Sequence, residues 1–192
     1  MCGIAGLIHG AALYDDAART AVRRMCDRMV ARGPDGNGDW FEPRVILGHR
    51  RLAILDLDPR ASQPMHSVCW RYVIVYNGEI YNYRDLRDAL AHQGVTFRTT
   101  SDTEVILTLF ATEGEAMLPK LHGMFAMVIW DRLAQRAFAA RDPYGIKPLY
   151  VATTADGVVF FIPGGGPAGN GADNARSRSL WSGRFLDAGE RA

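Results

Sequence analysis

A cysteine placed directly after the initiator methionine constrains this chain more than any other feature of its sequence. Removal of Met1 would leave Cys2 as the first residue, with a thiol and a free α-amine on the same residue. A thiol needs a base or a depressed pKa to attack well, and an α-amine titrates near ~8, close to neutral pH. Cys2 is therefore a candidate nucleophile that carries its own base. The alternative is a small buried residue that opens a strand, as free cysteines usually are.

The run after Cys2 predicts how this residue is held. Residues 3–9 are apolar and poor in helix formers, which predicts a buried strand with Cys2 at its beginning. The length of 192 residues suits one well-buried domain, and a hydrophobic fraction of 48% with 22% charged residues is typical of globular proteins.

Charge and cysteine content exclude several classes of function. The formal net charge of +1 gives no electrostatic support for a nucleic-acid or anionic-membrane partner. The sequence has no apolar run of about 18 residues and no signal-type amino terminus, so we expect a cytoplasmic protein with no membrane partner. Cys2, Cys26 and Cys69 lack C-x-x-C spacing, and the histidines form no tight cluster. We therefore expect neither a disulfide framework nor a metal site.

Apolar residues at helical spacing predict three helices. The first covers 17–31, where arginines occupy the side opposite the apolar face. The second covers 82–93, with Asn82 as its expected N-cap. The third begins near Ser101, which opens a capping box of the S-x-x-E form.

Strands are predicted in runs between these helices. The expected strands after residue 9 are 39–42, 45–54, 72–76, 95–99, 124–130, 137–141, 149–153 and 158–161. Runs of strands with few helices fit two sheets packed face to face with helices outside, an α+β fold.

Three polar stretches stand next to these elements. Arg50 and Arg51 follow an apolar run; an arginine there can bind the α-carboxylate of a free amino acid through two parallel hydrogen bonds, or lie at a solvated strand edge. Asn77 and Gly78 form a turn signal, or can supply an oxyanion hole from an amide side chain and a backbone N–H. Asp102 stands in a first helical turn, where acids are favoured for structural reasons alone.

Five short motifs stand in order along the first 104 residues. They are Met1-Cys2-Gly3-Ile4-Ala5-Gly6, Arg32-Gly33-Pro34-Asp35-Gly36, His49-Arg50-Arg51-Leu52-Ala53-Ile54, Asn77-Gly78-Glu79-Ile80-Tyr81-Asn82 and Ser101-Asp102-Thr103-Glu104. In this order they resemble class II glutamine amidotransferases, and most closely the glutaminase domain of glutamine-hydrolysing asparagine synthetases. The resemblance covers residues 1–161 as one domain. It implies the four-layer αββα sandwich of the amino-terminal nucleophile hydrolases.

The resemblance also implies the reaction and its catalytic residues. Cys2 would attack L-glutamine, release ammonia and form a thioester that water hydrolyses to glutamate, with its own α-amine as base. Asn77 and Gly78 would stabilise the oxyanion. No cofactor or metal is implied for this step.

The same resemblance assigns the substrate-binding residues. Arg51 would bind the α-carboxylate of glutamine and Asp102 its α-ammonium group. Asn77, Gly78 and Glu79 would lie along the bound amino acid. Arg32 and Asp35 would help to organise the loop that borders the site, although neither is assigned a specific role.

A further stretch fits the same family pattern near the end of the domain. Residues 141–150 read Arg-Asp-Pro-Tyr-Gly-Ile-Lys-Pro-Leu-Tyr. Proline and glycine fix a turn there, and Arg141 and Asp142 could pair, so we expect a positional role rather than a catalytic one.

The resemblance ends at residue 161. Residues 162–192 are rich in Gly, Ala, Arg and Pro, have little apolar periodicity, and are expected to be disordered. The Ser-Gly-Gly-x-Asp-Ser pyrophosphate loop of the ATP-dependent synthetase domain does not occur in the sequence. ATP and Mg²⁺ would belong to that missing domain, so we expect no complete asparagine synthesis from this chain alone.

Several alternatives stay open at this point. The ammonia acceptor could be a separate synthetase domain or subunit, or an enzyme acting on another acceptor such as a sugar phosphate or a cell-surface precursor. A non-catalytic, truncated remnant is the third interpretation, which the unusual tail favours. A homodimer is also left open.

Overall fold

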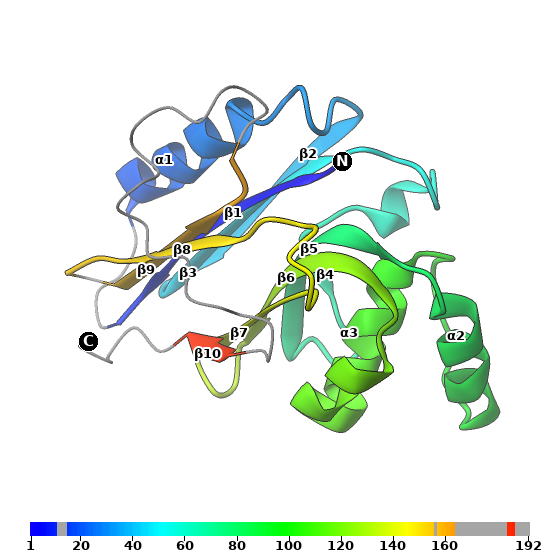
Figure 1. Ribbon diagram of the computed structural model, residues 1–192. Coiled ribbons are helices and arrows are strands. Elements are labelled where there is room, and N and C mark those ends of the chain that lie inside the picture. The colour runs from blue at the N-terminus through cyan, green and yellow to red at the C-terminus, as the bar shows by residue number, and fades with distance from the viewer. Residues whose placement is uncertain (11–14, 156, 164–183, 187–192) are drawn as a thin grey trace.

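The computed structural model describes residues 1–10, 15–155, 157–163 and 184–186. These residues form two five-stranded sheets, three α-helices and two 3-10 helices (Figure 1). No helix in this part of the chain has the length and the apolar character needed to cross a lipid bilayer. The α+β class predicted from the sequence is confirmed.

The first sheet has the strand order β2-β3-β1-β9-β8. Its strands are β1 (Gly3–His9), β2 (Gly36–Glu42), β3 (Val45–Arg51), β8 (Tyr150–Thr153) and β9 (Gly157–Phe161). The central strand β1 pairs antiparallel with β3 on one side and with β9 on the other. The strand that begins directly after Cys2 is therefore held from both sides.

The second sheet has the strand order β10-β7-β6-β5-β4. Its strands are β4 (Met65–His66), β5 (Tyr72–Ile80), β6 (Gly123–Asp131), β7 (Arg136–Arg141) and β10 (Arg184–Leu186). β5 continues through Asn77 and Gly78, which pair with Ala126 and Phe125 of β6. The Asn-Gly pair is thus part of a strand and not a turn.

Helices cover the outer face of each sheet, which gives four layers in the order αββα (Figure 1). The helix α1 (Asp16–Asp27) packs on β1 and β3. On the other side, α3 (Asp102–Glu113) packs on β5 and β4, with α2 (Tyr83–His92) beside it. This arrangement confirms the sandwich that the resemblance implies.

Strand alternation divides the apolar side chains between two cores. Val73 and Val75 of β5 face the first sheet and join the core that includes Ile4 and Ile8 of β1. Ile74 lies on the opposite face of β5, in the core beneath α3. Successive residues of β5 therefore reach two different environments.

The helix starts agree only in part with the expected caps. Ser101 Oγ accepts the Glu104 N–H at 3.3 Å, as a capping box requires. The Glu104 carboxylate turns instead to the backbone of the loop before it, so the reciprocal half of the box is absent. Asn82 makes no side-chain cap; its amide bonds the Lys120 carbonyl at 2.9 Å and the His122 N–H at 3.0 Å.

One predicted strand is wrong, and two strands were not foreseen. Residues 95–99 form no strand, because the buried Glu104 carboxylate accepts the N–H groups of Arg98 and Thr99. The short strands β4 and β10 gave no signal in the sequence, since each is only two or three residues long.

Most of the segment 162–192, expected to be disordered, lies outside the described residues. Ile162 is buried, and its N–H donates to the Ile4 carbonyl at 2.9 Å. Residues 184–186 form β10, which pairs antiparallel with β7. These described parts extend the two sheets.

Gly6 of β1 has no room for a side chain, which gives a test of this packing. An added Cβ would lie 2.4 Å from the Phe160 ring and 2.6 Å from the Ile46 carbonyl oxygen. Both neighbours are buried, so we expect Gly6→Ala to lower the free energy of unfolding by about 2 kcal/mol or more in urea denaturation. Gly36→Ala in β2 is the matched control, since its Cβ would meet only Arg51 Cβ at 3.6 Å. Equal urea midpoints for the two variants would contradict this account.

Candidate functional site

The beginning of β1 opens into a cavity of about 150 Å³. All the residues singled out from the sequence as catalytic or substrate-binding line it: Cys2, Arg51, Asn77, Gly78, Glu79 and Asp102. The volume is ten times the ~15 Å³ that one water needs, so the cavity can take a small molecule. The fold thus brings together residues from four separate parts of the chain.

Cys2 is partly buried and lines the cavity directly before the first residue of β1. Its Sγ accepts the Leu52 N–H at 3.3 Å, from the loop that follows β3. Burial raises the pKa of the Cys2 thiol, while the Leu52 N–H and the positive charges of the α-ammonium and Arg51 act in the opposite direction. This thiol needs a nearby base to ionise near neutral pH.

Met1 forms part of the cavity wall beside Cys2. Its α-ammonium donates to the Arg32 carbonyl at 3.1 Å, and Lys147 Nζ lies 2.9 Å from its Sδ. Burial lowers the pKa of this α-ammonium, and the charges of Arg32 and Lys147 lower it further. As long as Met1 is present, the Cys2 nitrogen is a peptide amide and cannot act as a base.

The Asn77 side chain offers an unpaired donor to this site. Asn77 is 1% exposed, and its Nδ2 has no hydrogen-bond partner among the described residues. A buried donor without a partner costs about 1–3 kcal/mol. Asn77 has the same parity on β5 as Val73 and Val75, so its side chain points toward the first sheet and Cys2. A ligand oxygen in the cavity could satisfy this amide.

The Gly78 backbone N–H points toward the same edge of β5 as two neighbouring N–H groups. The Tyr76 N–H donates to Gln63 Oε1 at 2.6 Å, and the Ile80 N–H donates to Asp102 Oδ2 at 3.1 Å. Alternate residues of an antiparallel strand direct their N–H groups the same way, and Gly78 lies between these two. Its N–H is therefore a second donor at the cavity wall.

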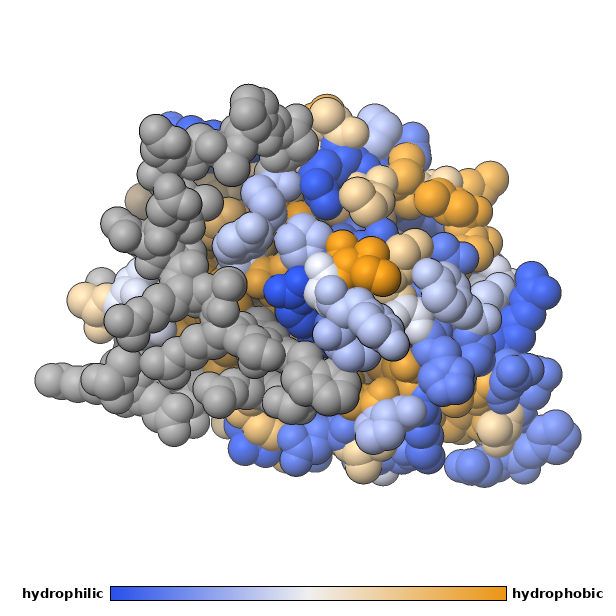
Figure 2. Space-filling model, viewed as in Figure 1, coloured by the Kyte–Doolittle hydropathy of each residue, from blue (hydrophilic) through white to orange (hydrophobic). Residues whose placement is uncertain are grey.

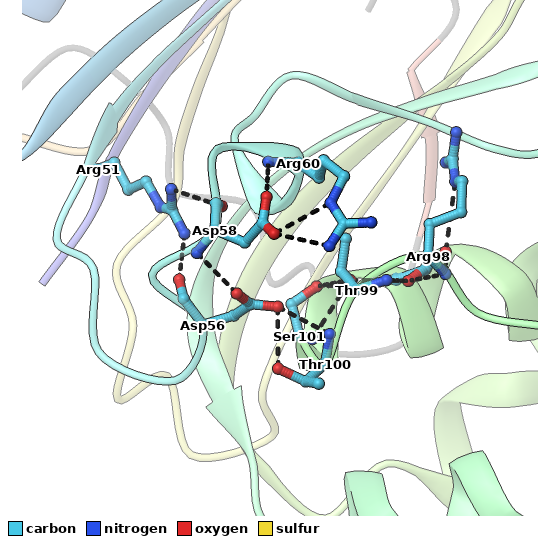
Figure 3. A network of polar contacts seen from close by, with 9 residues as sticks. Arg51, Asp56, Asp58, Arg60, Arg98, Thr99, Thr100 and Ser101 are labelled. Atoms are coloured by element: carbon cyan, nitrogen blue, oxygen red, sulfur yellow. Dashed lines mark hydrogen bonds and ion pairs between the residues drawn. The ribbon is translucent and has the colours of Figure 1, made fainter.

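Arg51 ends β3 and reaches into the loop that follows (Figure 3). Nη1 donates to the Asp58 carbonyl and to Ser62 Oγ, each at 3.3 Å, and Nη2 donates to the Asp56 carbonyl. A guanidinium has five N–H donors, so these bonds leave others for a carboxylate. The contacts hold the guanidinium in one place.

The loop of residues 52–58 forms one wall of the cavity and is tied to the start of α3. The Asp56 carboxylate accepts the Thr100 N–H at 2.7 Å and the Thr100 hydroxyl at 2.9 Å (Figure 3). Ile54 and Leu57 of this loop are largely exposed. Figure 2 shows hydrophobic residues exposed at the upper right of the molecule in this view.

Asp102 stands at the first turn of α3, and it is 5% exposed. Its Oδ2 accepts the Tyr76 hydroxyl at 2.8 Å and the Ile80 N–H. Burial raises the pKa of the Asp102 carboxyl, and these hydrogen bonds oppose that shift. Glu79, by contrast, is exposed at the cavity edge.

Arg32 and Asp35 lie in the loop after α1 and form hydrogen bonds with backbone groups next to the cavity. The Asp35 carboxylate accepts the Ala53 N–H at 2.9 Å, and the Asp35 N–H donates to the Arg51 carbonyl at 3.0 Å. Asp35 therefore fixes the start of the 52–58 loop, while the Arg32 carbonyl holds the chain terminus.

Histidine is not available as a base in this site. No histidine lines the cavity in the described part of the chain. His49, in the motif that contains Arg51, is 1% exposed, and burial lowers its pKa to about 3. It is therefore neutral at neutral pH and belongs to the core. No cluster of His, Cys, Asp or Glu among the described residues could hold a metal ion.

Lys147, which no sequence motif marked as a site residue, also lines the cavity and is 5% exposed. Its turn is organised by Asp142, a fully buried residue whose carboxylate accepts four backbone N–H groups. These groups belong to Phe125 at 3.2 Å, Tyr144 at 3.1 Å, Ile146 at 2.9 Å and Lys147 at 3.0 Å.

Arg141 does not pair with Asp142, because it donates to the Gly145 carbonyl at 2.7 Å. The sequence contained one signal that could have drawn attention to Lys147, because the chain has only two lysines.

Curated relatives of this chain include glutamine-hydrolysing asparagine synthetases. The chain is 42% identical over 161 residues to asparagine synthetase [glutamine-hydrolyzing] 1 of Bacillus subtilis, covering 83% of this chain and 25% of that protein. It is 41% identical over 174 residues to a putative asparagine synthetase [glutamine-hydrolyzing] of Mycobacterium tuberculosis, covering 82% of this chain and 26% of that protein. The chain thus spans about a quarter of the length of these relatives.

A solved structure shows the same fold at lower identity. The glutamine phosphoribosylpyrophosphate amidotransferase of B. subtilis superimposes with a TM-score of 0.69 and 22% identity, covering 83% of this chain and 41% of that chain.

A family model also matches most of the chain. Residues 1–162 match the family model described as a glutamine amidotransferase domain. This range holds both sheets apart from β10, all three helices and the whole cavity. The chain therefore belongs to the glutamine amidotransferase domain family.

Proposed function

We propose that the chain, once Met1 is removed, hydrolyses L-glutamine to glutamate and ammonia through a thioester at Cys2. It would do so as the glutaminase part of an asparagine-synthetase-type enzyme. The observation that carries the proposal is the Asn77 amide, which is buried, unpaired among the described residues and in the same cavity as the Cys2 thiol. A thiol in the same cavity as an unpaired hydrogen-bond donor suits a reaction in which an oxyanion develops.

In the first half of the reaction, the Cys2 sulfur adds to the carboxamide carbon of glutamine while the Cys2 α-amine takes the thiol proton. Asn77 Nδ2 and the Gly78 N–H donate to the oxygen, which becomes an anion. The new ammonium gives its proton to the leaving nitrogen and the C–N bond breaks. Ammonia departs and a thioester remains.

In the second half, water adds to the thioester carbon and gives a proton to the same α-amine. The oxyanion again lies against Asn77 and Gly78. The C–S bond breaks, the sulfur recovers its proton from the ammonium, and glutamate is released. One amine thus serves both halves as base and then as acid.

Charged groups that line the cavity would bind the amino-acid end of the substrate. Arg51 suits the α-carboxylate because its guanidinium is already held in place by the 52–58 loop. Asp102 suits the α-ammonium because a buried carboxylate gains most from a cation when little water is present. Glu79 would contact the exposed side of the same group.

The acceptor of the ammonia would lie in another domain or subunit. The relatives named as asparagine synthetases are about four times longer than the matched region. A synthetase partner of this kind would supply the site for ATP and Mg²⁺, neither of which the glutaminase step needs.

Release of Met1 gives the first test. We expect glutamate production to rise with the fraction of chains that begin at Cys2, as measured by intact-mass spectrometry, because only these chains have a free amine beside the thiol. Cys2→Ala should lower kcat by ~10⁴-fold or more, as expected for loss of a nucleophile. A folded, Met1-free protein that releases no glutamate from glutamine would falsify the proposal.

The Asn77 amide gives the second test. We expect Asn77→Ala to lower kcat for glutamine hydrolysis by ~10²–10³-fold, the usual loss when one oxyanion donor is removed. Asn37→Ala is the matched control, since Asn37 is exposed on β2 and does not line the cavity. If both variants keep wild-type kcat, Asn77 is not an oxyanion donor.

Asp102 gives a test of substrate recognition. We expect Asp102→Asn to raise KM for glutamine by ~10-fold or more, because a charge-assisted hydrogen bond to the α-ammonium is lost. Glutaramate, which lacks the α-amine, is the matched substrate. Its kcat/KM should change far less in the variant than that of glutamine. Equal losses for the two substrates would show that Asp102 acts only through the structure.

A further inference from the structure

Lys147 is a buried cation in the wall of the cavity that the proposed mechanism does not use. It is 5% exposed, although lysine is almost never fully buried without a partner. Lys147 and Lys120 are the only lysines in the sequence. Lys120 follows the usual pattern, since it is about half exposed and pairs with Glu113 at 2.7 Å.

The turn around Lys147 holds the backbone of this residue firmly. The Lys147 N–H donates to Asp142 Oδ2 at 3.0 Å, and the other Asp142 oxygen accepts the Ile146 N–H at 2.9 Å. Pro148 follows and fixes the next backbone dihedral. The side chain therefore starts from a rigid point and reaches into the cavity.

The Lys147 side chain points to the beginning of the chain. Its Nζ lies 2.9 Å from Met1 Sδ, and no carboxylate among the described residues lies within ion-pair distance. A thioether is a weak acceptor and does not neutralise an ammonium. Removal of Met1 takes this contact away and leaves the cation beside the new chain terminus.

Other charged groups lie near the beginning of the chain. Arg32 and Asp35, from the loop after α1, act on the pKa of the Met1 α-ammonium in opposite directions. Arg51, at the end of β3, and Asp102, at the start of α3, act on the thiol of Cys2, also in opposite directions. The Cys2 thiol also acts to raise the pKa of the Met1 α-ammonium, and Lys147 acts with Arg32 to lower it.

We propose that the Lys147 ammonium is a fixed positive charge that keeps the α-amine of the mature Cys2 neutral, and thus basic, near neutral pH. A cation beside an amine disfavours its protonated form, and the same charge favours the thiolate. Lys147 touches no reacting atom and acts through Cys2. The inference rests on the proposed function, in which this amine is the base.

The pH profile of kcat/KM for glutamine tests this inference, because it reports the essential groups of the free enzyme. Without the Lys147 charge the amine keeps its proton to higher pH. We therefore expect Lys147→Met to move the acidic limb upward by about one pH unit, the size expected for one charge ~10 Å away at an effective dielectric of ~20. Lys147→Arg keeps the charge and should stay near the wild-type limb. Lys120→Met, which removes one charge far from the cavity, is the matched control.

A second measurement does not depend on hydrolysis. The rate of Cys2 alkylation by iodoacetamide is followed against pH, with mass spectrometry of the amino-terminal peptide separating Cys2 from Cys26 and Cys69. The thiol and amine of one residue titrate as a coupled pair, so loss of the Lys147 charge should move this profile upward as well. Lys147→Gln provides a second neutral side chain if Lys147→Met does not fold.

The outcomes separate the two proposals. If both profiles of the folded neutral variant coincide with those of the wild type, the role of Lys147 is overturned while glutamine hydrolysis stands. If the arginine variant shifts as far as the neutral one, the effect is steric and the charge has no such role. If the wild type hydrolyses no glutamine, the proposed function fails, and the alkylation profiles still decide whether Lys147 acts on Cys2.

Discussion

The antiparallel pairing of β1 between β3 and β9 is the constraint on which the site depends. In this register Gly3 lies opposite Arg50, so the beginning of β1 meets the end of β3. This pairing places Cys2 and Arg51, which are far apart in the sequence, at the same end of two neighbouring strands. Hydrogen bonds on both sides of β1 then keep a chain terminus, normally a mobile part of a protein, in a defined position.

In the second sheet, strand β5 positions residues that line the cavity. Its alternating side chains send Asn77 toward the first sheet and Tyr76 toward α3, where the Tyr76 hydroxyl bonds Asp102. On the edge away from β6, the Tyr76 and Ile80 N–H groups donate to side chains rather than to a long neighbouring strand, and the Gly78 N–H lies between them. One strand therefore positions groups in both the proposed oxyanion region and the proposed binding region for the amino-acid end of a substrate.

Much of the fold could be predicted from the sequence because β1, α1 and α3 have strong apolar patterns. The predicted strand at 95–99 was wrong because the carboxylate of Glu104, at the start of the next helix, accepts backbone N–H groups of this segment, and the strand pattern of residues 95–99 does not reveal that competition. The cavity-lining residues were predicted from the motifs of a known family. The spacing of residues along the sequence could not by itself predict that Cys2 and Asp102 line the same cavity. Lys147 was missed because its burial depends on Asp142, whose four backbone bonds appear only in three dimensions.

The place of Met1 within the cavity wall has a practical consequence for producing this protein. A purification tag fused ahead of Met1 would prevent the removal of Met1, so that Met1 would stay beside Arg32 and Lys147 and the Cys2 nitrogen would remain a peptide amide. Such a protein could fold normally, since β1 begins only at Gly3, and still lack a free amine beside its sulfur. A recombinant sample made in this way would have the native fold and, under the proposed mechanism, would not hydrolyse glutamine.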